Sequence, residues 1–412
     1  MSSEFYRLKR LPPYLFAEVN GMKAKARAAG EDIIDLGMGN PDTATPKHIV
    51  DKMIEAVQDP KTHRYSSSRG IPGLRRAIAA YYQRRFGVKI DPEKEAVVTL
   101  GSKEGLVNLA QAITEPGDVI LVPSPTYPIH TYAFMIAGAA IRQLPFTPEH
   151  SEADLLASLE RAVRHSVPKP LALVLCFPAN PTARTCGLDF YRQVSEFAKR
   201  HGIYVISDLA YSELYFDGIA PPSILEVPGA KDVAIEIQSF SKTYSMAGWR
   251  MGYAVGNPKL VGALAHVKSY VDYGAFTPIQ VAATAALNGP QECVDELRRV
   301  YRERRDVLVK GLEAAGWEIP SPSASMFAWA PLPAAFRHLG SNEFAKLLLK
   351  EAKVAVSPGI GFGEYGEGYV RIAMVENVHR IRQAVRNIKA FFAASGVNSV
   401  QRLPARKRAA SS

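Results

Sequence analysis

The stretch LALVLCFPANPT, residues 171–182, is an apolar run that stops at an asparagine held between prolines. Such a run predicts a strand buried on both faces, because a half-exposed strand alternates apolar and polar residues. Further apolar runs, with helical patterns between most of them, occur at 96–100, 118–122, 203–207, 234–238 and 252–255. This order predicts an α/β fold in which helices flank a mostly parallel central sheet.

The pattern changes after about residue 290. A long charged helix is followed by a short apolar stretch at 326–330, a helix around 342–352 and a strand at 369–374. We expect a smaller α+β domain there. The predicted division is an N-terminal arm with part of the small domain (1–46), a large cofactor-binding domain (47–290), a small C-terminal domain (291–396) and a basic, disordered tail (397–412).

The composition is that of an ordinary soluble protein of 412 residues, 47% hydrophobic and 22% charged. The net charge of +10 does not predict a nucleic-acid partner, because the excess is spread out and the tail supplies Arg402, Arg406, Lys407 and Arg408. The chain lacks a signal-like start and an apolar run of about 18 residues. We therefore expect a cytoplasmic protein that does not enter a membrane.

The three cysteines, Cys176, Cys186 and Cys293, form no C-x-x-C pair. This spacing suggests neither a disulfide framework nor a zinc site, so no metal is expected. The cysteines are interpreted as structural, and so are His63 and His130.

Polar side chains stand after the predicted strands, where a doubly wound sheet collects its ligands. GSKEG (101–105) can hold a phosphate at a helix start, Asn180 offers a hydrogen-bond donor, and Asp208 is followed by Tyr211. Each has a plainer alternative. The glycine turn can be only a turn, the asparagine can belong to a proline turn, and the aspartate can cap a helix.

The stretch SFSKTYSMAGWR, residues 239–250, follows another of these strands. Lys242 stands there between Ser239 and Arg250, which can supply a hydroxyl and a guanidinium to an anion. A lysine that is close to other cations and out of water has a depressed pKa and becomes a nucleophile and base. In this order the polar groups match the requirements of pyridoxal 5'-phosphate.

From Leu11 to about Ala394 the chain resembles the class I/II, fold type I, pyridoxal-phosphate aminotransferases. The matching motifs occur in the family's order: MGNPD (38–42), YSSSRGIPGLRRAIA (65–79), GSKEG, PSPTYP (123–128), FPANPT (177–182), DLAY (208–211), SFSKTYSMAGWR and YVRIA (369–373). As a group they are highly specific.

The resemblance implies a role for each matched residue. Lys242 would be the Schiff-base lysine and the base that moves the Cα proton to C4', and Asp208 would keep the pyridine nitrogen protonated. The remaining cofactor contacts would be Asn180 and Tyr211 at the ring phenolate, Tyr127 stacked on the ring, and Ser102, Lys103 (through its backbone N–H), Ser239 and Arg250 at the phosphate.

The substrate α-carboxylate would be bound by Arg371, with help from Asn180 and the backbone of Gly39. Tyr65 would reach the phosphate of a neighbouring subunit, so the resemblance implies a homodimer with shared active sites.

LPPYLF, EDIIDLGMGNPD, SSSRGIPGLRRAI and KSYVDYGAFTPIQVAA are most similar to bacterial alanine (glutamate-pyruvate) transaminases. The expected ping-pong reaction is therefore L-alanine plus 2-oxoglutarate to pyruvate plus L-glutamate. Aspartate, LL-diaminopimelate, methionine and aromatic amino acids remain alternative substrates. A β-eliminating lyase shares the core motifs. A non-catalytic regulator would need a DNA-binding domain, for which the chain before the first motif leaves no room.

Overall fold

The computed structural model describes residue 5, residues 9–12 and residues 16–396. The predicted tail at 397–412 lies outside the described residues, as does part of the N-terminal arm. The main sheet has the order β2 (Ala96–Thr99), β8 (Gly252–Gly256), β7 (Ala234–Ser239), β6 (Tyr204–Asp208), β5 (Pro170–Cys176), β3 (Val119–Ser124) and β4 (Ala140–Pro145). Only β8 runs antiparallel to its neighbours in this sheet, which confirms the predicted, mostly parallel α/β architecture.

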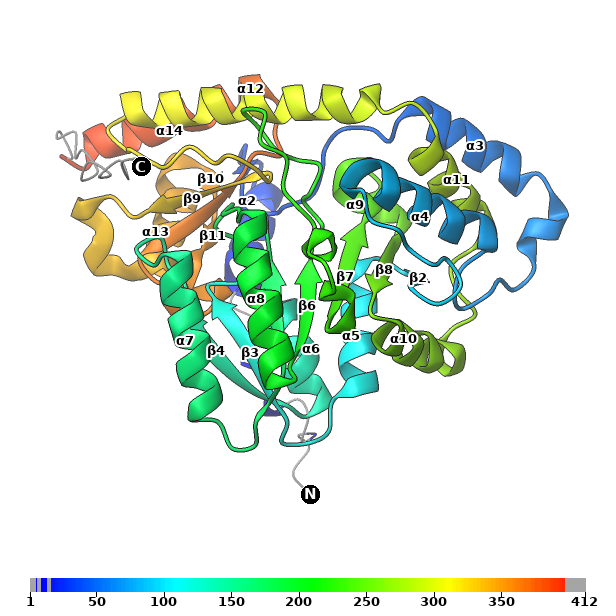
Figure 1. The fold of residues 1–412 in the computed structure, drawn as a ribbon. Coiled ribbons are helices and arrows are strands. Elements are labelled where there is room, and N and C mark those ends of the chain that lie inside the picture. The colour runs from blue at the N-terminus through cyan, green and yellow to red at the C-terminus, as the bar shows by residue number, and fades with distance from the viewer. Residues whose placement is uncertain (1–4, 6–8, 13–15, 397–412) are drawn as a thin grey trace.

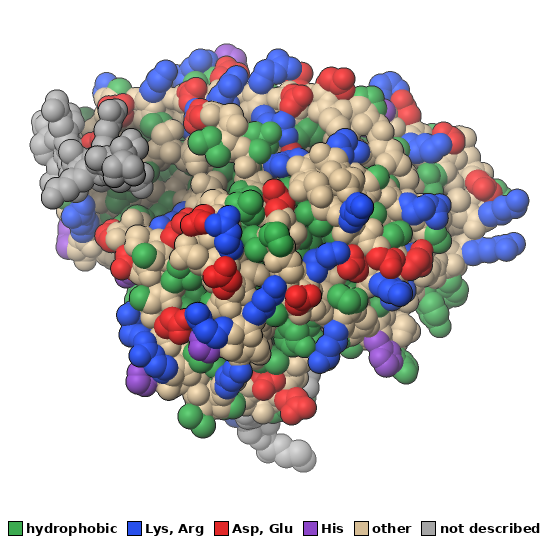
Figure 2. Space-filling view, in the orientation of Figure 1, with side chains coloured by type: hydrophobic (Ala, Val, Ile, Leu, Met, Phe, Trp, Pro, Cys, Tyr) green, Lys and Arg blue, Asp and Glu red, His purple; other side chains and the backbone are tan. Residues whose placement is uncertain are grey.

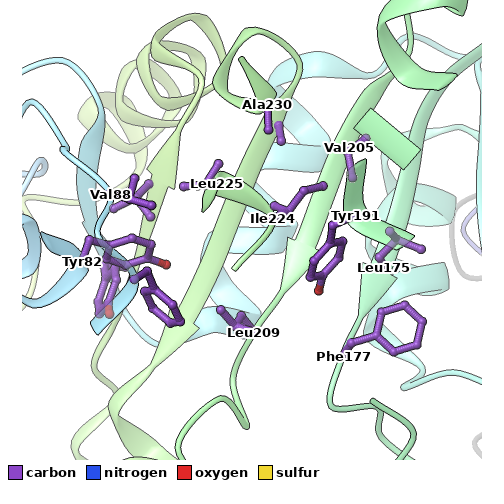
Figure 3. Packing of buried hydrophobic residues seen from close by; sticks show 14 of the residues in the cluster. Tyr82, Val88, Leu175, Phe177, Tyr191, Val205, Leu209, Ile224, Leu225 and Ala230 are labelled. Atoms are coloured by element: carbon purple, nitrogen blue, oxygen red, sulfur yellow. The ribbon is translucent and has the colours of Figure 1, made fainter. Parts of the chain in front are cut away.

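Helices cover both faces of the main sheet (Figure 1). On one face the side chains of Val98, Leu173 and Val205 belong to the cluster shown in part in Figure 3. This face is covered by α4 (Pro72–Phe86), α7 (Glu152–Arg164), α8 (Leu188–His201) and α11 (Thr277–Asn288). The opposite face is covered by α5 (Ser102–Ile113), α6 (Ile129–Ala137) and α10 (Pro258–Val271). Burial on both faces explains why these strands lack an alternating pattern.

The second part of the molecule mixes short strands and helices, as the sequence predicts. An antiparallel sheet joins β11 (Ser357–Pro358), β12 (Tyr369–Ala373) and β9 (Phe327–Pro331), and β1 (Ile34–Asp35) pairs with β10 (Val354–Ala355). The helices beside them are α2 (Phe16–Ala28), α13 (Gly340–Leu347), which continues into a π-helical turn at Leu348–Ala352, and α14 (Val378–Ala394). A separate hydrophobic cluster around Trp317 and Phe344 forms their core.

The long helix α12 (Glu292–Ala314) crosses the molecule from the neighbourhood of α3 (Lys47–Val57) and α11 to α14 (Figure 1). It begins close to the residue at which the sequence pattern changes. The domain boundaries themselves stay a prediction.

Two local features differ from the sequence interpretation. Strand β4 was not predicted, because it lies at the edge of the sheet and its residues Arg142 and Gln143 are only half-buried. Lys242, which its place after a predicted strand would put in a loop, lies instead in α9 (Phe240–Thr243), a single helical turn directly after β7. Ser239 begins this turn, with its Oγ accepting a hydrogen bond from the Ser241 amide at 3.1 Å.

One strand of the main sheet carries a buried carboxylate. The side chain of Glu236 in β7 is inaccessible to solvent and accepts hydrogen bonds from Tyr82 Oη (2.6 Å), Ser223 Oγ (2.8 Å) and the Ile224 amide (3.3 Å). Burial raises its pKa from 4.5 to about 7, although these donors oppose the shift.

Basic and acidic side chains are interspersed over the face seen in Figure 2. Among the described residues, no helix has both the length and the apolar character needed to cross a membrane. The expected location and the expected lack of a nucleic-acid partner stay predictions.

Candidate active site

A cavity of about 550 Å³ lies where the carboxyl ends of the main-sheet strands meet the smaller sheet. Residues that are far apart in the sequence converge on it, from α2 near the N-terminus to β12 near the C-terminus. Every predicted site residue except Tyr65 lines this cavity: Gly39, Ser102, Lys103, Tyr127, Asn180, Asp208, Tyr211, Ser239, Lys242, Arg250 and Arg371.

One end of the cavity is suited to an anion. Helix α5 begins at Ser102, so its first backbone N–H groups have no partner within the helix and lie beside Ser239 and Arg250 at the cavity wall. Gly101 has a φ of +86°, and a Cβ atom at this position would lie 2.5 Å from Arg250 Nη2. A glycine is therefore required here, because it alone lets the guanidinium approach the helix start. Ser241, which the sequence analysis did not select, also lines this wall.

The amine of Lys242 is buried at the centre of the cavity wall. Its Nζ donates a hydrogen bond to the Gly39 carbonyl at 2.8 Å. Burial, with a smaller contribution in the same direction from the positive charges of Arg371 and Arg250, lowers the pKa of Lys242 from 10.5 to about 8. An appreciable fraction of this lysine is thus uncharged near neutral pH, as a nucleophile or base must be.

Asp208 is held at the end of β6 by a chain of hydrogen bonds. One carboxylate oxygen accepts from the Ala210 amide at 3.1 Å, and the other lies 2.8 Å from His130 Nε2. His130 Nδ1 in turn lies 2.7 Å from Thr126 Oγ1. The interpretation of His130 as only structural missed this contact, although the histidine stands two residues after the recognised motif PSPTYP (123–128).

The same neighbourhood contains a group that could be taken for a metal site. Ligand atoms of His130, Cys176 and Asp208 lie within 4.8 Å of one another. However, two ligands of one tetrahedral zinc ion are roughly 3.3 Å apart, so the 2.8 Å separation of His130 and Asp208 is that of a hydrogen bond. Burial, together with the charge of Asp208, also raises the pKa of the Cys176 thiol, which disfavours the thiolate that zinc prefers.

Arg371 projects from β12 and is only 6% exposed. Its Nη1 donates to Asn180 Oδ1 at 2.8 Å, and its Nη2 donates to the Gly37 carbonyl at 2.8 Å and to Ser357 Oγ at 3.3 Å. Since the oxygen of the Asn180 amide is taken by Arg371, its nitrogen is the group that can donate to a ligand. Arginine and asparagine together suit a carboxylate.

Two tyrosines complete the wall. Burial, together with the nearby phenol of Tyr127, raises the pKa of Tyr211 well above its usual value, so this hydroxyl stays protonated and can donate a hydrogen bond. Tyr127 lies over His130 with the two rings nearly perpendicular, at a centroid distance of 5.9 Å and an interplanar angle of 85°.

Tyr65 lies outside the cavity and is 88% exposed. Its ring contacts that of Tyr273 at a centroid distance of 4.8 Å. Tyr270 and Val271, which precede Tyr273 in the sequence, are also exposed. These exposed apolar side chains suit an interface rather than a solvated surface.

Comparison with known proteins agrees with these features. The family described as "Aminotransferase class I and II" matches residues 31–388. The chain is 64% identical to the putative aminotransferase AatC of Rhizobium meliloti over 95% of this chain and 96% of that protein. It is 56% identical to the glutamate-pyruvate aminotransferase AlaC of Escherichia coli over 95% of both proteins.

Solved structures are similar over the same length. The substrate-bound structure of BacF from Bacillus subtilis superposes with a TM-score of 0.88 at 38% identity, covering 95% of this chain and 98% of that one. A Thermus thermophilus aspartate aminotransferase variant superposes with a TM-score of 0.86 at 28% identity, covering 95% and 100%.

Proposed function

Because the chain belongs to the class I and II aminotransferases, we propose that it exchanges an amino group between L-alanine and 2-oxoglutarate, with pyridoxal 5'-phosphate as cofactor. The products are pyruvate and L-glutamate, formed in two half-reactions at one site. The observation that carries the proposal is the convergence of Lys242, Asp208 and Arg371 on one cavity. The alanine specificity is supported by the 56% identity to the glutamate-pyruvate aminotransferase.

The residues present fit this cofactor. The helix start at Ser102 and the guanidinium of Arg250 suit its phosphate, and Gly101 leaves the space between them clear. The carboxylate of Asp208 suits a protonated pyridine nitrogen, and the amine of Lys242 suits its aldehyde. When bound, pyridoxal phosphate supplies an aldehyde that condenses with amines and a ring that accepts electrons from the substrate.

The chain's own groups then perform the proton transfers and hold the reactants. Lys242 takes the proton from the substrate Cα, which requires the uncharged amine that its lowered pKa provides. Asp208 presents its carboxylate to the ring nitrogen, with His130 fixing the direction of that carboxylate. Tyr211 and the amide nitrogen of Asn180 donate hydrogen bonds to the ring oxygen.

Arg371 binds the substrate α-carboxylate in this proposal. Its hydrogen bond to Asn180 joins the group that holds the substrate to one that holds the cofactor. The carbonyl of Gly39 lies next to the amine of Lys242. The two reactants are therefore oriented by connected groups, which lowers the entropic part of the barrier.

A second substrate, LL-diaminopimelate, is favoured by other relatives. The chain is 42% identical to the LL-diaminopimelate aminotransferase of Moorella thermoacetica over 94% of its length, and 43% identical to that of Desulforudis audaxviator. The higher identity to the glutamate-pyruvate enzyme supports alanine over LL-diaminopimelate as the proposed substrate.

The proposal includes a homodimer. Tyr65 carries a hydroxyl that can donate to the cofactor phosphate, and it begins the matched motif at 65–79. However, it is exposed and lies outside the cavity of its own chain. A role for Tyr65 therefore requires a second chain, and the exposed side chains around Tyr273 provide an apolar surface for it.

A half-reaction screen tests the substrate assignment. The holoenzyme is mixed separately with each of the twenty amino acids and with LL-diaminopimelate, and conversion of the cofactor to its amine form is followed by absorbance. We expect L-alanine and L-glutamate to be among the fastest. If LL-diaminopimelate is fast and alanine is not, the second assignment replaces the first.

A further inference from the structure

The guanidinium of Arg371 lies close to two aromatic rings. Its Cζ is 4.2 Å from the ring centroid of Phe327 and 4.7 Å from that of Phe362. Phe327 begins β9, next to β12, whereas Phe362 ends the 3-10 turn Gly359–Phe362. Both rings are almost fully buried.

Phe362 is itself fixed from two directions. Its carbonyl accepts a hydrogen bond from the Thr126 amide at 2.9 Å, and its ring meets that of Trp329 nearly at a right angle, with 5.9 Å between centroids. Thr126 precedes Tyr127 and contacts His130. Phe362 thus connects the smaller sheet to the segment that carries Tyr127, a residue of the cavity wall.

We propose that Phe362 is a positioning residue that fixes the plane of the Arg371 guanidinium and thereby sets the affinity for the substrate carboxylate. This inference rests on the proposed role of Arg371. The hydrogen bonds to Asn180, Gly37 and Ser357 fix the edges of the guanidinium, but a ring on its face is what prevents it from tilting.

The strength of the effect follows from burial. The attraction between a cation and an aromatic face is stronger when the cation is desolvated than when it is exposed to water. An aliphatic side chain fills the same space without offering a π face, so the guanidinium gains alternative orientations. We expect a loss of about 10-fold in carboxylate affinity when the ring is replaced.

Two substitutions separate the ring from its volume. Phe362→Leu keeps an apolar side chain, and Phe362→Tyr keeps an aromatic face. The measured quantities are the KM of L-alanine, kcat, and the inhibition constant of propionate, a carboxylate that has no amine. Phe362→Leu should raise the KM and the inhibition constant by about 10-fold with little change in kcat, because ground-state and transition-state binding weaken together. Phe362→Tyr should stay within about 3-fold of the natural protein.

The proposal is wrong if Phe362→Leu leaves propionate binding unchanged, or if the tyrosine variant loses as much as the leucine variant. Phe362→Met replaces the leucine variant if the latter does not fold. Phe336→Leu is the control: this ring stacks on Phe391 and Phe392 in the hydrophobic cluster around Trp317, so its loss should lower thermal stability without weakening propionate binding.

Arg371→Lys distinguishes the positioning role of Phe362 from the carboxylate-binding role of Arg371. If it weakens propionate and Phe362→Leu does not, the positioning role fails and the proposed function stands. If neither substitution affects propionate, Arg371 does not bind the carboxylate, and the assignment of this site fails with it.

Discussion

At the scale of single residues, the behaviour of Lys242 is set by its surroundings. Its amine is buried and faces the charges of Arg371 and Arg250, which favour the neutral form. We predict that covalent attachment of pyridoxal phosphate to the cofactor-free protein accelerates as pH rises, with a midpoint near 8 and not near 10.5. The rate is measured by borohydride trapping and mass spectrometry of the peptide containing residue 242.

Removing a neighbouring cation should move this midpoint upward, because the charged lysine is then less disfavoured. Arg371→Gln supplies that change, and Arg192→Gln on the exposed face of α8 is the control. A midpoint that stays the same in Arg371→Gln would show that the cation does not act on the lysine.

His130 provides a second prediction at this scale. Its hydrogen bond to Asp208 is buried and involves a charged acceptor, a type of bond that contributes about 1.5–3 kcal/mol. His130→Ala should therefore weaken cofactor binding by at least about 10-fold. The affinity is measured by titrating the cofactor-free protein and following absorbance. His165→Ala, an exposed histidine at the end of α7, should leave it unchanged.

The sequence was sufficient to bring Lys242, Asp208 and Arg371 to one site, because each stands in a recognised motif. Asp208 and Lys242 stand at or just after the end of a strand, whereas Arg371 lies within β12. It was not sufficient for His130 or Phe362. The role of His130 depends on the direction in which α6 presents its side chain, and that of Phe362 on the packing of a turn against Thr126. Neither direction is encoded in a local pattern.

At the scale of elements, β7 combines a carboxyl end that reaches the cavity with a buried acid. The pKa of Glu236 is about 7 in the folded chain and about 4.5 when the chain is unfolded. Its contribution to stability is complete below pH 4.5 and is lost as pH rises through 7. The loss amounts to about 3 kcal/mol at most.

Glu236→Gln should remove this dependence, since an amide does not ionise. Relative to the natural protein, the variant should gain apparent unfolding free energy between pH 5 and pH 8, measured by urea denaturation at both values. Glu196→Gln, on the exposed side of α8, controls for loss of a carboxylate without burial. Equal pH dependence in the Glu236 variant and the natural protein would contradict the assignment.

Elements with a strong apolar pattern were predictable, and those without one were not. The central strands were recognised because both of their faces are buried. Strand β4 escaped recognition because an edge strand is half-exposed, and α9 did so because one helical turn is too short for a periodic pattern.

At the scale of the whole molecule, the proposed dimer can be tested by mixing inactive chains. A Lys242→Ala chain keeps Tyr65, and a Tyr65→Ala chain keeps Lys242. If Tyr65 serves the partner's site, a mixed dimer contains one site with both residues intact. Co-refolded variants should therefore regain up to about a quarter of the natural activity, assuming random pairing of the two chains into dimers.

Sedimentation of the mixture shows whether dimers are present. Dimers without recovered activity would mean that Tyr65 does not reach the partner's site, whereas a fully active monomer would exclude the dimer itself. Tyr204→Ala, at the first residue of β6 and outside the cavity lining, provides a tyrosine control when it is paired with the Lys242→Ala chain.

The overall architecture followed from the sequence, but the shape of the cavity did not. Gly39, Asn180 and Arg371 meet only when the smaller sheet is packed against the ends of the main strands. The residues that discriminate between amino-acid side chains depend on the same packing, so motifs alone leave the substrate open.

The charges around the cavity also bear on how quickly ligands arrive. Asp208 is the carboxylate among the described lining residues, whereas the basic ones are Lys23, Lys103, Lys242, Arg250 and Arg371. An amino acid such as alanine is a zwitterion without net charge near neutral pH, whereas 2-oxo acids and phosphate esters are anions. A concave positive surface attracts anions over a distance of about 10 Å at moderate salt and increases their rate of encounter. We therefore expect 2-oxo acids to reach the cavity faster than an uncharged zwitterion such as alanine, because only the anions are attracted to it.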